Sequence, residues 1–458
     1  VFGERIGQTC STQSRASCYI TSLYGVTTHD PSRPVHCGSN RQSELVFKMV
    51  RLIGLCALLS LHPIAALAGS SLEDLALQKT LGDASPVFGV YQDVQSRTST
   101  WMRAYPDDTP IAHMNIPGTH DTATWNYSRA TQQYLDHVTS LVGLHDTDPT
   151  LYRCQQSSIV DMLNAGIRVF DLRYAFDVTN STLVFWHGPA LQSETATLDD
   201  VLIGYYKWLD DHPSEAVFLS FQYQGSTAPN AQNDAGVQTL LYSALTSPPS
   251  KEYVLQTKDH IGTLGEARGK VTLLKRFDLN KLDPSYDASL PGVHFSPNDW
   301  DDNVSFVESL GALQVADMPQ GPNITLVYNK DTGETAYIED YYQPMTPQGS
   351  SLEENIIWKY NATVAHLQMA AQTHPDSLFW SFASSNNIGN TPPNTPEEQA
   401  LGDGTVTGVN QRLIPFLKTQ RGKRLGIVMF DFFEEPSDLM STFLSLLPPK
   451  CAKKARSS

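Results

Sequence analysis

The sequence predicts an α/β protein built on a parallel sheet, arranged either as a barrel or as a doubly wound sheet. Short apolar, β-rich segments alternate with longer amphipathic segments, an order typical of parallel strands joined by helices. The chain of 458 residues is 40% hydrophobic and 17% charged, which is ordinary globular composition. That composition excludes a wholly disordered, a collagen-like and a polytopic membrane protein. We expect a single domain over residues 70–458.

Seven segments have the length and composition of buried strands. They are residues 111–121, 167–176, 182–188, 216–223, 270–277, 377–384 and 424–433. Helices are expected at 198–210, where Thr197 and two acidic residues precede apolar residues at helical spacing, and at 353–372 and 406–418.

Two further segments interrupt this alternation. Residues 325–342 predict a β-hairpin that turns at Asp331-Thr332-Gly333, with apolar residues on both arms. Residues 386–404 are rich in Pro, Gly and Asn and directly follow a predicted strand, so they form a candidate rim or lid.

The first 68 residues are expected to lie outside the fold. Met49 opens a short basic start, which is followed by an apolar run and small residues up to Ala68, the pattern of a secretory signal peptide over residues 49–68. The alternative is a membrane anchor, but the run is short for a span and contains His62 and Pro63. Residues 1–48 are then a non-native or misassigned extension.

The chain is strongly acidic. The formal net charge is −16, and beyond residue 68 the chain keeps 26 Lys and Arg against 45 Asp and Glu, a net charge of −19. This charge argues against a nucleic-acid partner, which requires a basic footprint. Any phosphate chemistry must therefore depend on a few local cations.

Cysteines and sequons agree with a secreted, extracellular glycoprotein, which we expect to be a monomer. Beyond residue 68 the cysteines are Cys154 and Cys451, which form either one long-range disulfide or two free thiols. Five sequons begin at Asn126, Asn180, Asn303, Asn323 and Asn361.

Polar residues lie at the carboxyl ends of the predicted strands. They are His120, Asp121, Asp171, Arg173, His187, Lys275, Arg276 and Asp431. A barrel gathers the carboxyl ends of its strands on one face, where active sites lie. The sequence therefore predicts two imidazoles, three carboxylates and two or three cations around one concave active site.

This combination suits cleavage of a phosphodiester. One imidazole can accept the proton of an attacking hydroxyl while a second, protonated, imidazole donates one to the leaving oxygen. Carboxylates orient the rings, and a guanidinium stabilises the phosphoryl oxygens without a metal. A metal site formed by His120, Asp171 and His187 is an alternative, but Arg173 would repel the cation. Asp171 and Arg173 could also be only an internal ion pair, and Asp431 could cap a turn.

Three motifs in this order resemble the X domain of phosphatidylinositol-specific phospholipase C. They are IPGTHDTAT at 116–124, GIRVFDLRYAF at 166–176 and WHGP at 186–189, with weaker similarity at 218–221, 269–277 and 426–433. The closest resemblance is to the small, metal-independent bacterial type and its secreted fungal relatives. It implies a single distorted TIM barrel and no cofactor. It also implies a phospholipid or phosphoinositide substrate at a membrane surface, whose inositol 2-hydroxyl attacks phosphorus to release diacylglycerol and a cyclic inositol phosphate.

The resemblance also assigns roles. It implies that His120 is the general base with Asp431 as its partner, and that His187 is the general acid supported by Asp121. Arg173 stands where calcium-dependent relatives hold their metal, with Asp171 nearby.

Substrate contacts are assigned in the same way. Arg276 resembles a residue that contacts inositol, and Lys275 lies beside it. Gln222 occupies a position where the family often has a headgroup-contacting lysine, which leaves the headgroup open.

Alternative functions belong to other classes. One is a calcium- or magnesium-dependent glycerophosphodiester or sphingomyelin phosphodiesterase, which would require acidic metal ligands where Arg173 lies. Another is a catalytically silent secreted binding protein on the same barrel. A nucleic-acid phosphodiesterase conflicts with the net charge of −19 beyond residue 68.

Overall fold

The computed structural model describes residues 71–142, 147–224, 232–300, 302–303, 324–344, 346–347 and 349–447. Residues 70–458 form one compact unit. The predicted extension at 1–48 and the predicted signal peptide at 49–68 lie outside the described residues. Among the helices of the described ranges, none combines the length and apolarity that crossing a bilayer requires.

Within the described residues, eleven strands form one sheet system. They are β1 (Ile116–Thr119), β2 (Val169–Phe176), β3 (Leu183–His187), β4 (Ala190–Leu191), β5 (Val217–Tyr223), β6 (Val271–Arg276), β7 (Val293–His294), β8 (Ile324–Asn329), β9 (Glu334–Glu339), β10 (Leu378–Phe382) and β11 (Ile427–Phe430). The main path runs β7-β6-β5-β2-β1-β11-β10-β9-β8, and every pair along it is parallel except β8 with β9.

Each parallel strand lies beside its neighbour in the sequence, and the first, β1, pairs with the last, β11. That order is the order of a TIM barrel. The barrel is distorted at one seam, because the described path ends at β7 on one side and at the hairpin strand β8 on the other. Aromatic packing spans this seam, with the ring of Phe295 5.6 Å from Trp380 and 5.9 Å from Tyr328.

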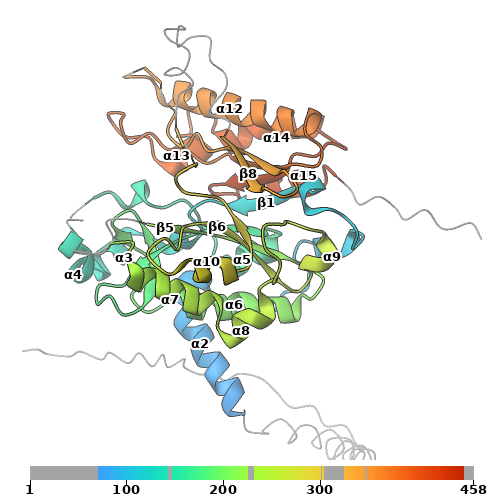
Figure 1. Ribbon diagram of the computed structural model, residues 1–458. Helices are drawn as coiled ribbons and strands as arrows, with labels where there is room; N and C mark the ends of the chain where they lie inside the picture. The colour runs from blue at the N-terminus through green and yellow to red at the C-terminus, as the bar shows by residue number, and fades with distance from the viewer. Residues whose placement is uncertain are drawn as a thin grey trace, which may run out of the picture. The chain divides into compact units, whose positions relative to one another are not determined.

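Helices surround the strands (Figure 1). The longer ones are α2 (Leu72–Phe88), α6 (Leu198–Asp211), α7 (Ala235–Leu245), α12 (Leu352–Gln372) and α14 (Val409–Thr419). The shorter ones are α3 (Arg129–Tyr134), α4 (Asp136–Thr139), α5 (Ile159–Ala165), α8 (Pro248–Tyr253), α9 (Leu264–Ala267), α10 (Pro284–Ser289), α13 (Pro396–Leu401) and α15 (Leu439–Leu444).

These elements confirm the predicted helices at 198–210, 353–372 and 406–418 within a few residues. Helix α6 begins with a capping box in which Thr197 accepts from the backbone of Asp200, as the acidic residues of its first turn predict. The hairpin β8–β9 is also confirmed, and Gly333 in its turn has a φ of 76°, a conformation that favours glycine.

Alternation along the strands divides the core in two. Val169, Phe218 and Ile427 belong to a cluster inside the barrel, whereas Phe170 and Leu219 pack in a cluster with the surrounding helices. Because side chains alternate with a period of two, a residue's position along its strand decides whether it faces the barrel interior.

A buried ion pair lies at the amino ends of β2 and β5. Arg168 Nη2 is 2.7 Å from Glu215 Oε2, and both side chains are fully buried. The guanidinium also donates to the carbonyls of Leu163 and Ser99, and Glu215 accepts from the backbone of Met102. The pair therefore ties the segment before β1 to the barrel.

We expect Glu215→Gln to lower the free energy of unfolding by about 3–5 kcal/mol, because it leaves a buried guanidinium without its counter-charge. Urea denaturation measures this loss. The matched control is Asp83→Asn in the exposed Lys79–Asp83 pair, which should cost much less because solvent screens that pair. Equal losses in the two variants would contradict this role for the buried pair.

Candidate active site

The carboxyl end of the barrel brings most of the predicted polar residues together. His120 and Asp121 directly follow β1, and Asp431 directly follows β11. Asp171 and Arg173 lie within β2, and His187 ends β3.

His120 is a buried imidazole that lies between a carboxylate and a guanidinium. Its Nδ1 lies 3.0 Å from Oδ1 of Asp431, and its Nε2 accepts from Nη2 of Arg173 at 2.8 Å. Since a guanidinium can only donate, these contacts assign a neutral ring that carries its proton on Nδ1. Burial lowers the pKa of His120 well below its usual value, and the charges of Arg173 and His187 lower it further.

His187 has the opposite surroundings. Its Nδ1 donates to the carbonyl of Tyr152 at 2.8 Å, and its Nε2 lies 3.2 Å from Oδ2 of Asp121. Both ring nitrogens therefore face groups that can accept a hydrogen bond. The two imidazole rings lie 6.5 Å apart between centroids.

Arg173 lies among the carboxylates. Its Nε is 3.0 Å from Oδ1 of Asp121 and 3.3 Å from Oδ2 of Asp171. Burial opposes the charge on Arg173, but these two carboxylates outweigh it and raise the guanidinium pKa. Burial raises the pKa of Asp121, and Arg173 opposes that rise.

Asp121 has a left-handed backbone, with φ 41° and ψ 52°. Its backbone nitrogen donates to Oδ2 of Asp171 at 3.3 Å. Left-handed φ values are uncommon outside glycine and are found where the surrounding structure holds them. Here the conformation directs the Asp121 carboxylate between Arg173 and His187.

A second cation, Arg276 on β6, faces the same interior. Its Cζ lies 3.7 Å from the centroid of the Trp300 ring, and its Nη2 is 3.4 Å from Oδ2 of Asp340. Nε1 of Trp300 donates to the same Asp340 oxygen at 2.8 Å. Nη1 of Arg276 and Oε1 of Gln222 on β5 are buried and have no hydrogen-bond partner within the described ranges. Such atoms can meet the hydroxyl groups of a ligand.

Asp340 and Trp300 are not among the sequence-predicted residues. Asp340 directly follows β9, so it obeys the same strand-end rule as the predicted residues. The sequence prediction treated that segment only as a hairpin arm. Trp300 lies in no strand, and nothing in the sequence indicates its contact with Arg276.

Residues 136–277 match the sequence family described as "Phosphatidylinositol-specific phospholipase C, X domain". This confirms the resemblance predicted from the motifs.

Curated relatives agree with this assignment. The 1-phosphatidylinositol phosphodiesterase of Listeria monocytogenes is 31% identical over 181 residues, which is 39% of this chain and 48% of that protein. The PI-PLC X domain-containing protein 1 of Mus musculus is 32% identical over 131 residues, 26% of this chain and 37% of that protein. The chain thus spans about half or less of the length of these relatives.

Solved structures show the same fold. A structure of phosphatidylinositol-specific phospholipase C from S. aureus, from work on its membrane binding, matches with a TM-score of 0.55 and 18% identity over 77% of this chain and 98% of that one. A double mutant of the S. aureus enzyme matches with a TM-score of 0.53 and 16% identity, at the same coverage. The predicted distorted TIM barrel is confirmed.

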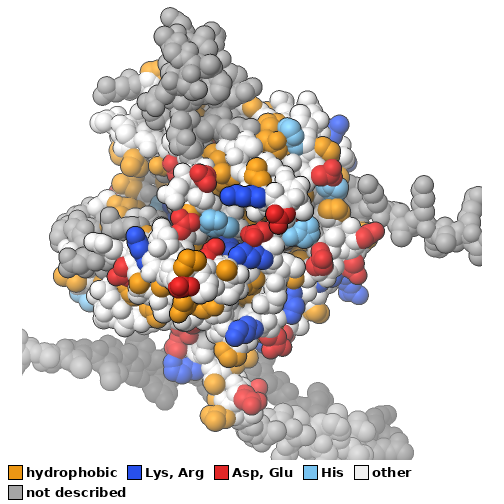
Figure 2. Space-filling view, in the orientation of Figure 1, with side chains coloured by type: hydrophobic (Ala, Val, Ile, Leu, Met, Phe, Trp, Pro, Cys, Tyr) orange, Lys and Arg blue, Asp and Glu red, His pale blue; other side chains and the backbone are white. Residues whose placement is uncertain are grey.

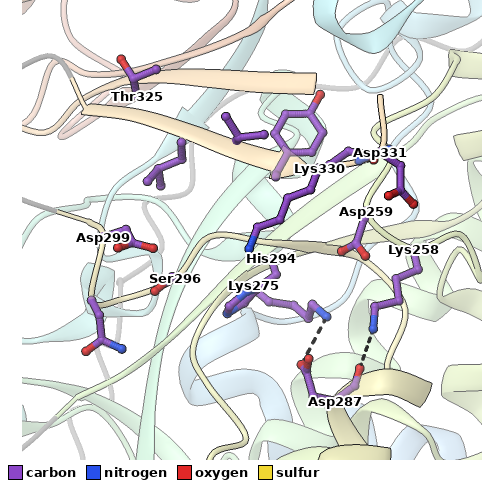
Figure 3. Close-up of a pocket in the computed structure, with 15 residues that line it drawn as sticks. Lys258, Asp259, Lys275, Asp287, His294, Ser296, Asp299, Thr325, Lys330 and Asp331 are labelled. Atoms are coloured by element: carbon purple, nitrogen blue, oxygen red, sulfur yellow. Dashed lines mark hydrogen bonds and ion pairs between the residues drawn. The ribbon is translucent and has the colours of Figure 1, made fainter. Parts of the chain in front are cut away.

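Lys275, which the sequence analysis predicted to contact substrate, faces away from the candidate active site. Its neighbour Arg276 points into the barrel, so alternation along β6 turns Lys275 outward, where its Nζ lies 3.8 Å from Oδ1 of Asp287. There it lines a separate cavity of about 990 Å³ beside the seam (Figure 3).

That cavity carries charges of both signs. Lysines 258, 275 and 330 face aspartates 259, 287, 299 and 331. Basic and acidic side chains also alternate across the coloured part of the face in Figure 2, without a continuous field of either sign.

Cys154 corrects another prediction. It is a free, fully buried thiol, with Sγ 4.0 Å from Nδ1 of His187. The structure therefore gives no support to the disulfide predicted with Cys451, because it shows the Cys154 thiol free and buried within the site. Cys451 itself lies outside the described residues.

The sequons fall in different surroundings. Asn126 and Asn180 are exposed, and Asn303 and Asn361, the latter within α12, are half-buried. Asn323 lies outside the described residues. Glycosylation at these positions stays a prediction.

We expect Cys154 to resist alkylation in the folded protein, because burial raises its pKa well above the usual value and excludes the reagent. Iodoacetamide should modify it only after denaturation without reductant, and mass spectrometry of the Cys154 peptide detects the adduct. A Cys154 peptide that reacts only after reduction would instead reveal the originally predicted disulfide.

Proposed function

We propose that the chain is a secreted phosphoric diester hydrolase or lyase of the phosphatidylinositol-specific phospholipase C type. The observation that carries this proposal is the difference between the polar surroundings of two neighbouring imidazoles. Nε2 of His120 accepts a hydrogen bond, whereas both nitrogens of His187 face acceptors. One ring is thus prepared as a base and the other as an acid.

The reaction follows from these protonation states. Nε2 of His120 takes the proton of the inositol 2-hydroxyl as that oxygen attacks phosphorus, and Asp431 stabilises the resulting imidazolium through Nδ1. The bond between phosphorus and the diacylglycerol oxygen breaks as Nε2 of His187 donates its proton to that oxygen. The products are diacylglycerol and a cyclic inositol phosphate.

Arg173 supplies the positive charge at the phosphoryl group. Its guanidinium lies beside His120 and can donate to the non-bridging oxygens, whose charge grows in the transition state. Calcium would need the carboxylates of Asp121 and Asp171, and both already pair with this guanidinium. These residues do not fit a calcium ion, so we propose metal-independent catalysis.

The substrate side of the site offers a donor and an acceptor without hydrogen-bond partners among the described residues, although Nη1 of Arg276 lies 3.8 Å from Oδ1 of Asp171. Nη1 of Arg276 and Oε1 of Gln222 can bind headgroup hydroxyls. Gln222 lacks the positive charge of the lysine that the family often has at this position. An inositol headgroup without extra phosphates, including that of a glycosylated inositol lipid, therefore fits this active site.

A lipid surface is the proposed partner. Exposed apolar side chains lie on segments that follow β1 and β10, at the end of the barrel that holds the site: Tyr134 is 73% exposed, and Leu141 and Ile388 are each 60% exposed. These residues can enter an interface while the site faces the membrane. The net charge of −19 beyond residue 68 argues against strong attraction to anionic lipids.

The first test uses phosphatidylinositol vesicles with EDTA, with phosphorus NMR to detect products. We expect a cyclic inositol phosphate from the wild-type chain, and a loss of kcat of about 10²–10⁴-fold in both His120→Ala and His187→Ala. His113→Ala, which removes an exposed imidazole, is the matched control and should retain activity. Activity that requires calcium, or that survives either catalytic substitution, would contradict the proposal.

A second test follows from the lowered pKa of His120. The base acts only when neutral, so activity is lost as the pH falls through the His120 pKa. Because that pKa lies well below 6.5, the acidic limb of the kcat/KM profile should also lie below pH 6.5. An acidic limb at or above pH 6.5 would contradict the burial of the base.

A further inference from the structure

Residues Tyr152–Gln155, here called the 152–155 segment, contact the carboxyl ends of β1, β3 and β11, which carry the two catalytic imidazoles and Asp431. The segment lies before α5 and belongs to none of the described helices or strands. The catalytic account above assigns it no role.

Two of its contacts are made by main-chain carbonyls. The carbonyl of Tyr152 accepts from Nδ1 of His187, and that of Cys154 accepts from the backbone nitrogen of Phe432, one residue after Asp431. The backbone nitrogen of Cys154 in turn donates to Oγ1 of Thr124, three residues after Asp121.

The side chain of Gln155 makes the remaining contacts. It is fully buried, and its Nε2 donates to the carbonyl of His120 at 2.7 Å and to the carbonyl of Phe430 at 2.9 Å. The carbonyl of Phe430 also accepts from the backbone nitrogen of His120 at 3.2 Å. One amide thus holds both main chains next to the His120–Asp431 contact.

We propose that Gln155 is a positioning residue for the general base, and that the 152–155 segment fixes the two imidazoles relative to each other. This inference rests on the proposed function. The hydrogen bond between His120 Nδ1 and Asp431 Oδ1 is 3.0 Å long and joins side chains from two different strand ends. Its geometry therefore depends on how the main chains of those two ends are held. Gln155 supplies the cross-link at that point, and Tyr152 fixes His187 from the same segment.

The test is Gln155→Met, which keeps the length of the side chain and removes its donor. A misplacement of a catalytic group by about 1 Å can cost about 100-fold in rate, so we expect kcat to fall about 10- to 100-fold with KM changed less than about threefold. A water-soluble inositol phosphodiester avoids effects on membrane binding. Proton NMR of the full chain should show the low-field signal of the His120 Nδ1 proton broadened or lost, and His120→Ala assigns that signal.

Gln238→Met is the matched control. Gln238 on α7 is also buried and bonded through its Nε2 to Asn233 and Asn280. It should lose comparable stability in thermal unfolding but keep kcat and the low-field signal. If Gln155→Met does not fold, Gln155→Glu retains the shape and replaces the donor with an acceptor, and the same changes are expected.

The proposal is overturned if a folded Gln155 variant keeps wild-type kcat and the low-field signal, or if Gln238→Met loses them equally. The NMR signal requires no turnover. A wild-type chain that cleaves no inositol phosphodiester therefore refutes the proposed function, while the signal still tests the positioning role.

Discussion

Arg173 lies where three buried groups meet, and the electrostatics of the site depend on its charge. Asp121 and Asp171 would repel each other without it, and Nε2 of His120 would have no donor facing it. Burial lowers the pKa of His120 and the guanidinium lowers it further, while the guanidinium opposes the rise that burial causes in the pKa of Asp121. The same cation thus helps to keep the base neutral and holds Asp121 where its carboxylate also faces His187.

The barrel places that cation. Alternation along β2 turns Asp171 and Arg173 to the same interior face, and the parallel order places β1 beside β2 and β11 on the other side of β1. Strand-end position and period-two spacing are readable from sequence, so the principal residues of the site could be predicted. The same rule, applied along β6, would have separated Arg276 from Lys275, which the strand-end prediction had treated together.

Other parts of the site could not be read from the sequence because they depend on tertiary contacts between distant segments. Trp300 packs on Arg276 beside the seam, where the strand order of a regular barrel is interrupted. Cys154 and Gln155 lie in a segment without regular secondary structure, and their contacts are with residues at the ends of β1 and β11 that are distant in the sequence. The number of cysteines favoured a disulfide, but that number contains no information about burial, and Cys154 is a buried free thiol.

The central claim is that His120 is the general base and His187 the general acid, and a change of leaving group tests it most directly. kcat should be compared on phosphatidylinositol and on an inositol phosphate ester with a nitrophenyl leaving group, which departs without protonation. The account predicts that His187→Ala regains most of its lost kcat on the nitrophenyl ester, while His120→Ala stays inactive on both substrates. Recovery of His120→Ala, or of neither variant, would contradict the assignment of base and acid.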